Sequence, residues 1–357
     1  MANKGYNSYR GRRRGKQNLL IFLLVLVLLA ACAFIFLQRY VTYADDGSFY
    51  LDLPFFRKQE PPPAPAADSG ETEQDMNLII DTPEDPEPEQ TVSPYGERRL
   101  VGLAELPADA SELSGMLEEA GANGFVCTLR DNTGRVYFDS TAAIRTAVKD
   151  APAGGTVLSE LCAAEGVVSV ARLNCFHDSY YAWDNMESAG ICQSTGYIWY
   201  DNLSYHWLDP AKEQARRYVI SLALECAELG FDELLLEEAC YPASGNLEKI
   251  DYSGNELGKT EALMCFLTEL REAVSSYDVK LSLLLDGRLF TQEGGYAAAS
   301  GQELAQLLPL VDAVYVNAAD VDAAQEALTA AAGEADLPAL VLITETAEDG
   351  GNWYLAP

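Results

Sequence analysis

The feature that most constrains this fold is the alternation of strand patterns and helical patterns between residues 98 and 357. Each strand candidate is a short, mostly apolar run, as is typical of strands that are buried on both faces. The eight candidates are Leu100–Ala104, Gly124–Thr128, Val167–Leu173, Glu233–Glu237, Val279–Leu285, Ala313–Val316, Ala339–Thr344 and Trp353–Ala356. Helical patterns lie between them, at Ser111–Ala120, Val157–Ala164, Pro210–Leu229, Thr260–Ser275, Gly301–Leu308 and Val321–Ala332.

These residues number about 260, the usual size of one eight-fold β/α barrel. We predict an α/β fold, a (β/α)8 TIM-like barrel, because eight strands favour closure over an open doubly wound sheet. The sequence has no GxGxxG fingerprint after the first strand and no Walker-type phosphate loop. It therefore predicts no cofactor.

Residues 19–37 form an uninterrupted apolar run, about long enough to cross a bilayer as one helix. Residues 1–18 carry six basic and no acidic side chains, and such a flank is expected to stay cytoplasmic. We therefore expect a single-pass transmembrane helix with a cytoplasmic tail and an extracellular C-terminal domain. A lipoprotein is the alternative, since Leu29-Ala30-Ala31-Cys32 resembles a lipoprotein cleavage site. The apolar run continues past Cys32, which favours the anchor.

Between the predicted anchor and the barrel lie a juxtamembrane segment, residues 38–58, and a linker, residues 59–97. The linker is rich in Pro, Glu and Asp, a composition that buries little apolar surface and predicts a disordered tether. The barrel domain is predicted at residues 98–357. The whole chain has 24 Lys and Arg against 55 Asp and Glu, a formal net charge of −31. This excess disfavours nucleic acid as a partner.

Carboxylates follow two neighbouring strands of the predicted barrel. Glu237 and Glu238 come directly after Leu234-Leu235-Leu236, and Asp286 follows the next strand. Active sites of such barrels lie at the carboxyl ends of the strands. Glycoside hydrolysis needs two carboxyl groups across a small cleft, one as nucleophile or base and one as proton donor. We predict Glu237 for the first role and Asp286 for the second; the alternative is that these residues cap the following loops.

Arg172 lies inside the apolar strand pattern Val170-Ala171-Arg172-Leu173, so its charge needs a buried partner. Glu237, on the next strand, is the predicted partner. Pairing would keep this carboxylate ionised, as a nucleophile requires. A purely structural ion pair is the alternative.

The insertion after the third strand, residues 174–208, is rich in aromatic side chains and contains both histidines. Aromatic rings stack on the apolar faces of sugars, while imidazoles and carboxylates bind hydroxyl groups. His177, Asp178 and Trp207 are therefore predicted to shape a carbohydrate groove. His177 and His206 lack the spacing of metal ligands, so no metal site is predicted.

Several segments resemble, in the same order, the motifs of one family. They are Phe125–Tyr137, Ser169–Arg172 with Phe176–Asp178, Trp207–Pro210, and Gly230–Glu233 with Tyr241–Pro242. The family comprises bacterial TIM-barrel domains, formerly of unknown function, that are distantly related to α-amylases and are catalogued as glycoside hydrolases by inference. The resemblance implies a barrel that acts on glycans. Arg130 and Asp131, in the first of these segments, and Glu238, beside Glu237, are predicted to bind the substrate.

The chain departs from this family at four positions. Thr128 and Arg130 stand where the family usually has Asp and Lys, Glu237 replaces the expected catalytic Asp, and Cys240 replaces an Arg. A shift of about 1 Å at a reacting group can cost about a hundredfold in rate. Two functions are therefore predicted: a membrane-anchored glycoside hydrolase acting on cell-wall or external polysaccharide, or a catalytically degenerate barrel that binds carbohydrate or serves as an envelope scaffold.

Overall fold

The computed structural model describes residues 41–43, 49–51, 96–153, 155–291, 295–333, 335–348 and 350–357. The chain divides into two compact units, residues 1–85 and 86–357. In the first unit, β1 (Val41–Tyr43) pairs antiparallel with β2 (Phe49–Leu51). The predicted anchor, residues 19–37, and the linker up to residue 95 lie outside the described residues. Within the described part of the chain, no helix has the length and apolarity that crossing a membrane requires.

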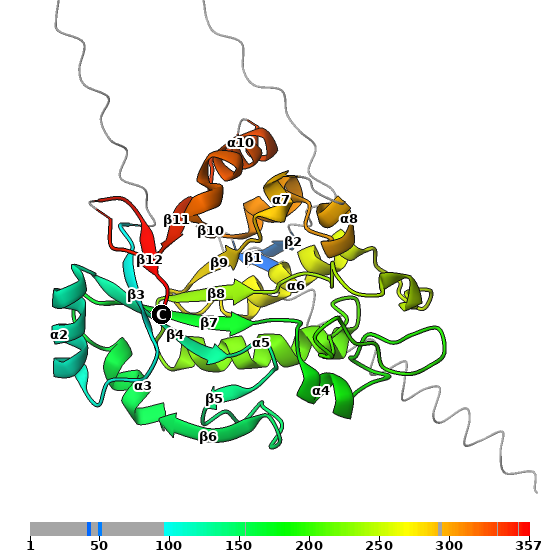
Figure 1. The fold of residues 1–357 in the computed structure, drawn as a ribbon, viewed down its shortest axis with the longest axis horizontal. Helices are drawn as coiled ribbons and strands as arrows, with labels where there is room; N and C mark the ends of the chain where they lie inside the picture. The colour runs from blue at the N-terminus through cyan, green and yellow to red at the C-terminus, as the bar shows by residue number, and fades with distance from the viewer. Residues whose placement is uncertain are drawn as a thin grey trace, which may run out of the picture. The chain divides into compact units, whose positions relative to one another are not determined.

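The second unit is an eight-stranded parallel barrel (Figure 1). Its strands are β3 (Arg99–Leu103), β4 (Gly124–Arg130), β7 (Val168–Asn174), β8 (Glu233–Glu237), β9 (Lys280–Leu284), β10 (Ala313–Asn317), β11 (Ala339–Thr344) and β12 (Trp353–Leu355). The ring closes because β12 pairs in parallel with β3. All eight strand predictions are confirmed, including the last one on which closure depends.

Two further strands extend the sheet outside the ring. β5 (Val136–Phe138) pairs antiparallel with the end of β4, and β6 (Val148–Ala153) pairs parallel with β5. In Figure 1 they lie below β4, next to α3. The register of β4 against β7 shifts between Thr128 and Arg130. Such a bulge leaves one extra residue on β4 and changes the face to which the following side chain points.

Helices cover the outside of the ring. The longer ones are α2 (Ala110–Ala120), α3 (Gly155–Cys162), α5 (Glu213–Glu228), α6 (Lys259–Ala273) and α10 (Val321–Ala332). Shorter ones are α4 (Ser179–Asp184), α7 (Arg288–Thr291), α8 (Tyr296–Ser300), α9 (Leu304–Leu307) and the 3-10 turns Leu247–Lys249, Leu308–Leu310 and Ala318–Asp320. The helix predicted at Gly301–Leu308 is confirmed only in part, because α9 spans Leu304–Leu307 and Gly301 lies outside it. Gly301 ends α8 with a φ of +77°, a left-handed conformation that glycine adopts without strain and that stops a helix.

The barrel interior is a packed core and not a pore. Its apolar layer consists of Leu100, Val126, Val170, Leu235, Ala313, Tyr315, Val341 and Tyr354. Near the starts of the strands, the fully buried Glu233 accepts hydrogen bonds from Arg98 Nε at 3.2 Å and from the Tyr315 hydroxyl at 2.9 Å. These partners satisfy the buried charge. A solvent-accessible site must therefore lie at the opposite, carboxyl ends of the strands.

Candidate functional site

Arg172 and Glu237 form a two-pronged ion pair at the carboxyl ends of β7 and β8. Arg172 Nε donates to Glu237 Oε2 at 3.0 Å, and the guanidinium NH2 donates to Oε1 at 2.7 Å. The side chains remain 23% and 21% exposed, so they are accessible from the mouth of the barrel. The predicted pairing is confirmed. Two parallel bonds fix the plane of the carboxylate as well as its position.

Glu237 belongs to a small pocket of about 160 Å³. The pocket is lined by Glu237, Glu238, Cys240, Leu284, Asp286, Tyr296 and Gln302. Asp286 follows β9 and accepts hydrogen bonds from Arg288 Nε at 2.9 Å and from the Arg288 NH2 group at 2.6 Å. The prediction that carboxyl groups from two neighbouring strand ends share one cleft is therefore confirmed.

Glu238 has an unusual backbone and an unusual side-chain environment. Its φ of +49° lies in the left-handed region, which disfavours side chains other than glycine. Burial, followed by the negative charge of Glu237, raises the pKa of the Glu238 carboxyl to about 7. Hydrogen bonds from Arg288, in contrast, lower the pKa of the Asp286 carboxyl. The pocket thus holds one carboxyl group whose pKa is raised to near neutrality and one whose pKa is lowered.

His177 and Trp207 lie in the insertion after β7 and support each other. Their rings stack with centroids 4.4 Å apart. Asp201 Oδ2 lies 3.0 Å from His177 Nε2 and accepts a hydrogen bond from Trp207 Nε1 at 3.2 Å. Burial is the main cause that lowers the pKa of His177, while the charge of Asp201 and, to a smaller extent, that of Glu237 act in the opposite direction. The start of the insertion contacts the strand end that carries Glu237, because the Cys175 N–H donates to the Glu237 carbonyl oxygen at 2.7 Å. Both rings are largely buried.

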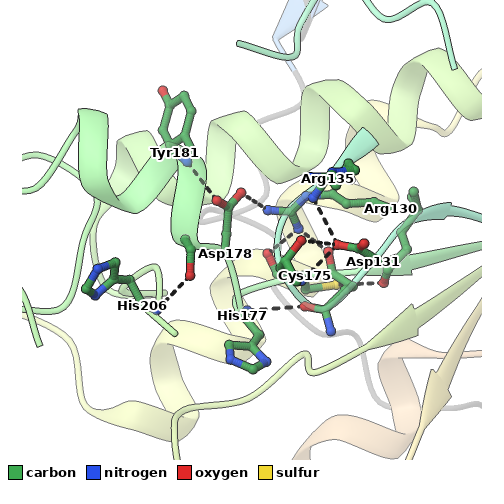
Figure 2. Close-up of polar contacts among 12 residues, drawn as sticks. Arg130, Asp131, Arg135, Cys175, His177, Asp178, Tyr181 and His206 are labelled. Carbon is green, nitrogen blue, oxygen red and sulfur yellow. Dashed lines mark hydrogen bonds and ion pairs between the residues drawn. The ribbon is translucent and has the colours of Figure 1, made fainter. Parts of the chain in front are cut away.

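Arg130 and Asp178 are fully buried and face each other (Figure 2). The Arg130 NH2 group donates to Asp178 Oδ2, and NH1 donates to the carbonyl oxygens of Asn174 and Cys175. Asp178 also accepts from the Tyr181 backbone N–H at 2.7 Å and so caps α4. These bonds fasten the end of β7 to the start of the insertion. Substrate contact by Arg130 and Asp178 stays a prediction, and their burial makes a role in holding the insertion the more direct interpretation.

The bulge in β4 explains why Arg130 points outward. Without it, Arg130 would share a face with Thr128, two residues earlier, and would point into the barrel. Instead its guanidinium carbon lies 5.5 Å from the centre of the Tyr218 ring on α5, outside the ring of strands.

Asp131, also predicted to bind substrate, lies in a different and larger pocket of about 770 Å³ beside the ends of β3 and β4. Burial would raise its pKa, but hydrogen bonds from Thr133, Tyr137 and Arg135 hold it below the ordinary value. Tyr137 donates to Asp131 Oδ2 at 2.7 Å. Neither Glu237 nor Glu238 lines this pocket. We place the candidate site at the smaller pocket, because paired carboxyl groups carry the chemistry and volume alone does not.

Two residues that line the smaller pocket, and Arg288, which bonds the lining residue Asp286, were not identified from the sequence. Tyr296 and Gln302 come from the segment between β9 and β10 and lie in no pattern that marks a site. Arg288 was visible in the run Asp286-Gly287-Arg288, where a cation two residues after a strand-end carboxylate is a usable signal. In the part of the chain that the structure describes, no group of three His, Cys, Asp or Glu side chains is arranged to hold a metal ion.

The sequence profile of a family described as "putative glycosyl hydrolase domain" matches residues 104–316. This match spans more than half of the chain. The chain belongs to this family. The match begins at the end of β3 and ends within β10, so it contains Arg172, Glu237, Glu238 and Asp286.

Solved structures similar to this family member include glycoside hydrolase domains. The PgaB (BpsB) glycoside hydrolase domain from Bordetella bronchiseptica is 18% identical, with a TM-score of 0.53, and the match covers 73% of this chain and 94% of that domain. A hypothetical protein from Ruminiclostridium thermocellum is 26% identical, with a TM-score of 0.41, and the match covers 49% of this chain and 89% of that protein. The first similarity supports the barrel fold. A search of curated proteins found no match.

Proposed function

We propose that this protein is a glycoside hydrolase that cleaves polysaccharide at the pocket around Glu237. The observation that carries the proposal is the arrangement of carboxyl groups there. Glu237 is held by Arg172, and Glu238, with a pKa of about 7, lines the same pocket. A carboxyl group fixed by a guanidinium, beside a second carboxyl group of raised pKa, suits acid-assisted cleavage of a glycosidic bond.

In this mechanism the Glu237 carboxylate attacks the anomeric carbon, or removes a proton from a water that does so. The bond between that carbon and the glycosidic oxygen breaks, and the bonding electrons leave with the oxygen. A proton donor on the other side supplies the proton for the leaving oxygen. Arg172 holds the carboxylate plane in place through both of its hydrogen bonds.

The sequence predicts Asp286 as the proton donor, whereas the electrostatics favour Glu238. A proton donor must carry its proton at the working pH. Burial and the neighbouring Glu237 charge keep a proton on Glu238 up to a pH of about 7. Asp286 is paired with Arg288, which lowers its pKa and favours the ionised form. We therefore assign the donor role to Glu238 and leave Asp286 as a lining residue of the pocket that pairs with Arg288.

We also propose that the barrel acts outside the cell, on cell-wall or other external polysaccharide. The support comes from the sequence: the apolar run at residues 19–37 behind a basic tail predicts an anchor, and residues 59–97 predict a tether between anchor and barrel. The excess of acidic residues favours neutral or cationic glycans over polyanions.

Cell fractionation tests the anchor. The full chain should sediment with membranes and require detergent for release, and protease added to cells with a permeable outer wall should degrade the barrel. Cys32→Ser should leave the mobility of the chain on a denaturing gel unchanged, because an uncleaved helix loses no segment. Slower migration of Cys32→Ser than of the native chain would favour the lipoprotein instead, because only the native chain would then lose the segment before Cys32.

A catalytically degenerate barrel that binds carbohydrate is the second candidate. It is favoured by the replacement of the family's Asp by Glu237 and of an Arg by Cys240. A glycan array combined with reducing-sugar release separates the two candidates. Cleavage of an array glycan that stops in the Glu237→Gln variant supports the hydrolase. Binding without release supports the binding protein and overturns the hydrolase.

A further inference from the structure

The insertion after β7 exposes three large aromatic rings. Trp183 is 63% exposed, Tyr197 is 73% exposed and Tyr200 is 55% exposed. The other tryptophans, at positions 199, 207 and 353, are at most 6% exposed. Removing a large ring from water is favourable, so three exposed rings on one insertion are a feature that requires an explanation.

The three rings surround one hollow of about 580 Å³. Its wall is completed by Met186, Ile198, Gln193 and His206. Among the residues that the structure describes, no Asp, Glu, Lys or Arg side chain lines the hollow. The surface is therefore a set of flat apolar faces with an amide and an imidazole at its edge.

The backbone that carries these rings is well supported. Gln193 Nε2 donates to the Ile198 carbonyl oxygen at 3.0 Å, and the Gln193 backbone N–H donates to the Tyr197 carbonyl oxygen at 2.7 Å. His206 Nδ1 lies 2.8 Å from the Trp199 carbonyl oxygen. Trp183 lies on α4, whose first turn is capped by the buried Asp178. Rings held on such a frame lose little conformational entropy when a ligand binds.

We propose that Trp183, Tyr197 and Tyr200 form a binding surface for a neutral polysaccharide chain, outside the Glu237 pocket. Sugar rings present apolar C–H faces that stack on aromatic rings, and their hydroxyl groups can bond Gln193 and His206 at the edge. The uncharged lining of the hollow matches an uncharged ligand. This inference rests on the proposed function. It specifies that the substrate is a polysaccharide chain that extends beyond the sugar unit at the cleaved bond.

A second copy of the same chain is a poorer occupant of this surface. Both copies would carry the same formal charge of −31, and like charges oppose association. The rings also belong to the insertion whose first residues contact the strand end that carries Glu237, because the Cys175 N–H donates to the Glu237 carbonyl oxygen at 2.7 Å.

Trp183 provides a direct probe, because it is the exposed tryptophan among four. We would measure acrylamide quenching of tryptophan fluorescence in the Glu237→Gln variant, so that no sugar is cleaved during the titration. The probes are chitohexaose, cellohexaose and laminarihexaose, with the matching monosaccharides as controls. We expect at least one hexasaccharide to shield Trp183 while its monosaccharide does not. Shielding by none of them, or shielding that grows with protein concentration alone, overturns the proposal.

Substitution of the two tyrosines tests the same surface independently of the fluorescence measurement. Tyr197→Ala and Tyr200→Ala should each weaken hexasaccharide binding about tenfold, the loss expected for one well-placed aromatic contact. Leu203→Ala is the matched control, because Leu203 is 69% exposed in the same insertion and does not line the hollow. Equal binding by the native protein and all three variants overturns the proposal.

Failure of the proposed binding surface can be distinguished from failure of the proposed hydrolase function. If an activated aryl glycoside is cleaved by the native protein and no hexasaccharide shields Trp183, the binding surface is wrong and the hydrolase stands. If a hexasaccharide shields Trp183 and no glycoside is cleaved, the surface stands and the hydrolase is wrong.

Discussion

Glu237 and Glu238 are consecutive in the chain and nevertheless line the same pocket. In a regular strand their side chains would point to opposite faces. The φ of +49° at Glu238 breaks this alternation directly after β8. The strained backbone is held in place because the Cys175 N–H donates to the Glu237 carbonyl oxygen at 2.7 Å and the Phe176 N–H donates to that of Glu238 at 3.3 Å. Strain of this kind concentrates at functional sites.

The first prediction concerns Glu237. Glu237→Gln keeps a side chain of equal size that can still bond Arg172, but it removes the carboxylate that we propose as nucleophile or base. We expect the rate of glycan cleavage to fall by about a thousandfold or more, within the range for loss of a general acid or base. Reducing-sugar release measures the rate, and a thermal melt checks the fold. Glu119→Gln, an exposed residue on α2, is the control. Unchanged turnover in Glu237→Gln would remove the assignment.

The second prediction concerns the pH dependence of cleavage. A donor must be protonated, so activity that depends on Glu238 should decline as the pH rises through about 7. Glu238→Gln should lose this decline and should retain more activity on aryl glycosides with good leaving groups than on unactivated glycans. Asp286→Asn is the matched variant. If Asp286→Asn abolishes the decline and Glu238→Gln does not, Asp286 is the donor.

The third prediction is a stability effect of the same residue. The folded-state pKa of Glu238 is raised from 4.5 to about 7, so the proton-linked stability is fully present below a pH of about 4.5. It is lost as the pH rises through about 7, because the folded protein then bears a buried charge. Glu238→Gln removes that charge and should stabilise the fold by up to about 3 kcal/mol at pH 8. Urea unfolding at pH 8 and pH 4 would measure the difference, and a gain of equal size at both values would contradict it.

The fourth prediction concerns the buried pair Arg130–Asp178. Asp178→Ala leaves the guanidinium buried without its carboxylate and removes the cap of α4. We expect a loss of about 3–5 kcal/mol in the free energy of unfolding. Glu213→Ala breaks the exposed pair with Arg217 and should change stability little. Similar effects of the two substitutions in urea unfolding would show that the buried pair is not important for stability.

The fifth prediction compares two glycines. A Cβ at Gly134 would lie 2.3 Å from the Asp178 carboxyl carbon, and the φ of Gly134 is +88°. Gly134→Ala should therefore destabilise the protein by about 1–3 kcal/mol. Gly115 lies inside α2, and a Cβ added there would meet no other atom within 4 Å, so Gly115→Ala should stabilise by about 0.5–1 kcal/mol. Thermal melts of the two variants should shift in opposite directions.

The ring of strands and one central contact could be predicted from the amino-acid sequence. Strands such as Glu233–Glu237 are short apolar runs between helical patterns. Such a run is typical of a buried strand whatever the rest of the fold. The Arg172–Glu237 pair was also readable, because a cation in an apolar strand needs a neighbour of opposite charge. Both predictions depend on short-range information: the apolar pattern of a single strand, or a pair of residues on neighbouring strands.

Only the tertiary structure established which carboxyl groups line the pocket together and how their pKa values are shifted. The bulge in β4 turned Arg130 outward into a buried pair with Asp178, and the left-handed backbone turned Glu238 toward Glu237. Tyr296 and Gln302 reached the pocket from a segment without a recognisable pattern. The physical reason is that burial at a site comes from residues distant in the chain. The raised pKa of Glu238 follows first from this burial and second from the charge of its neighbour Glu237.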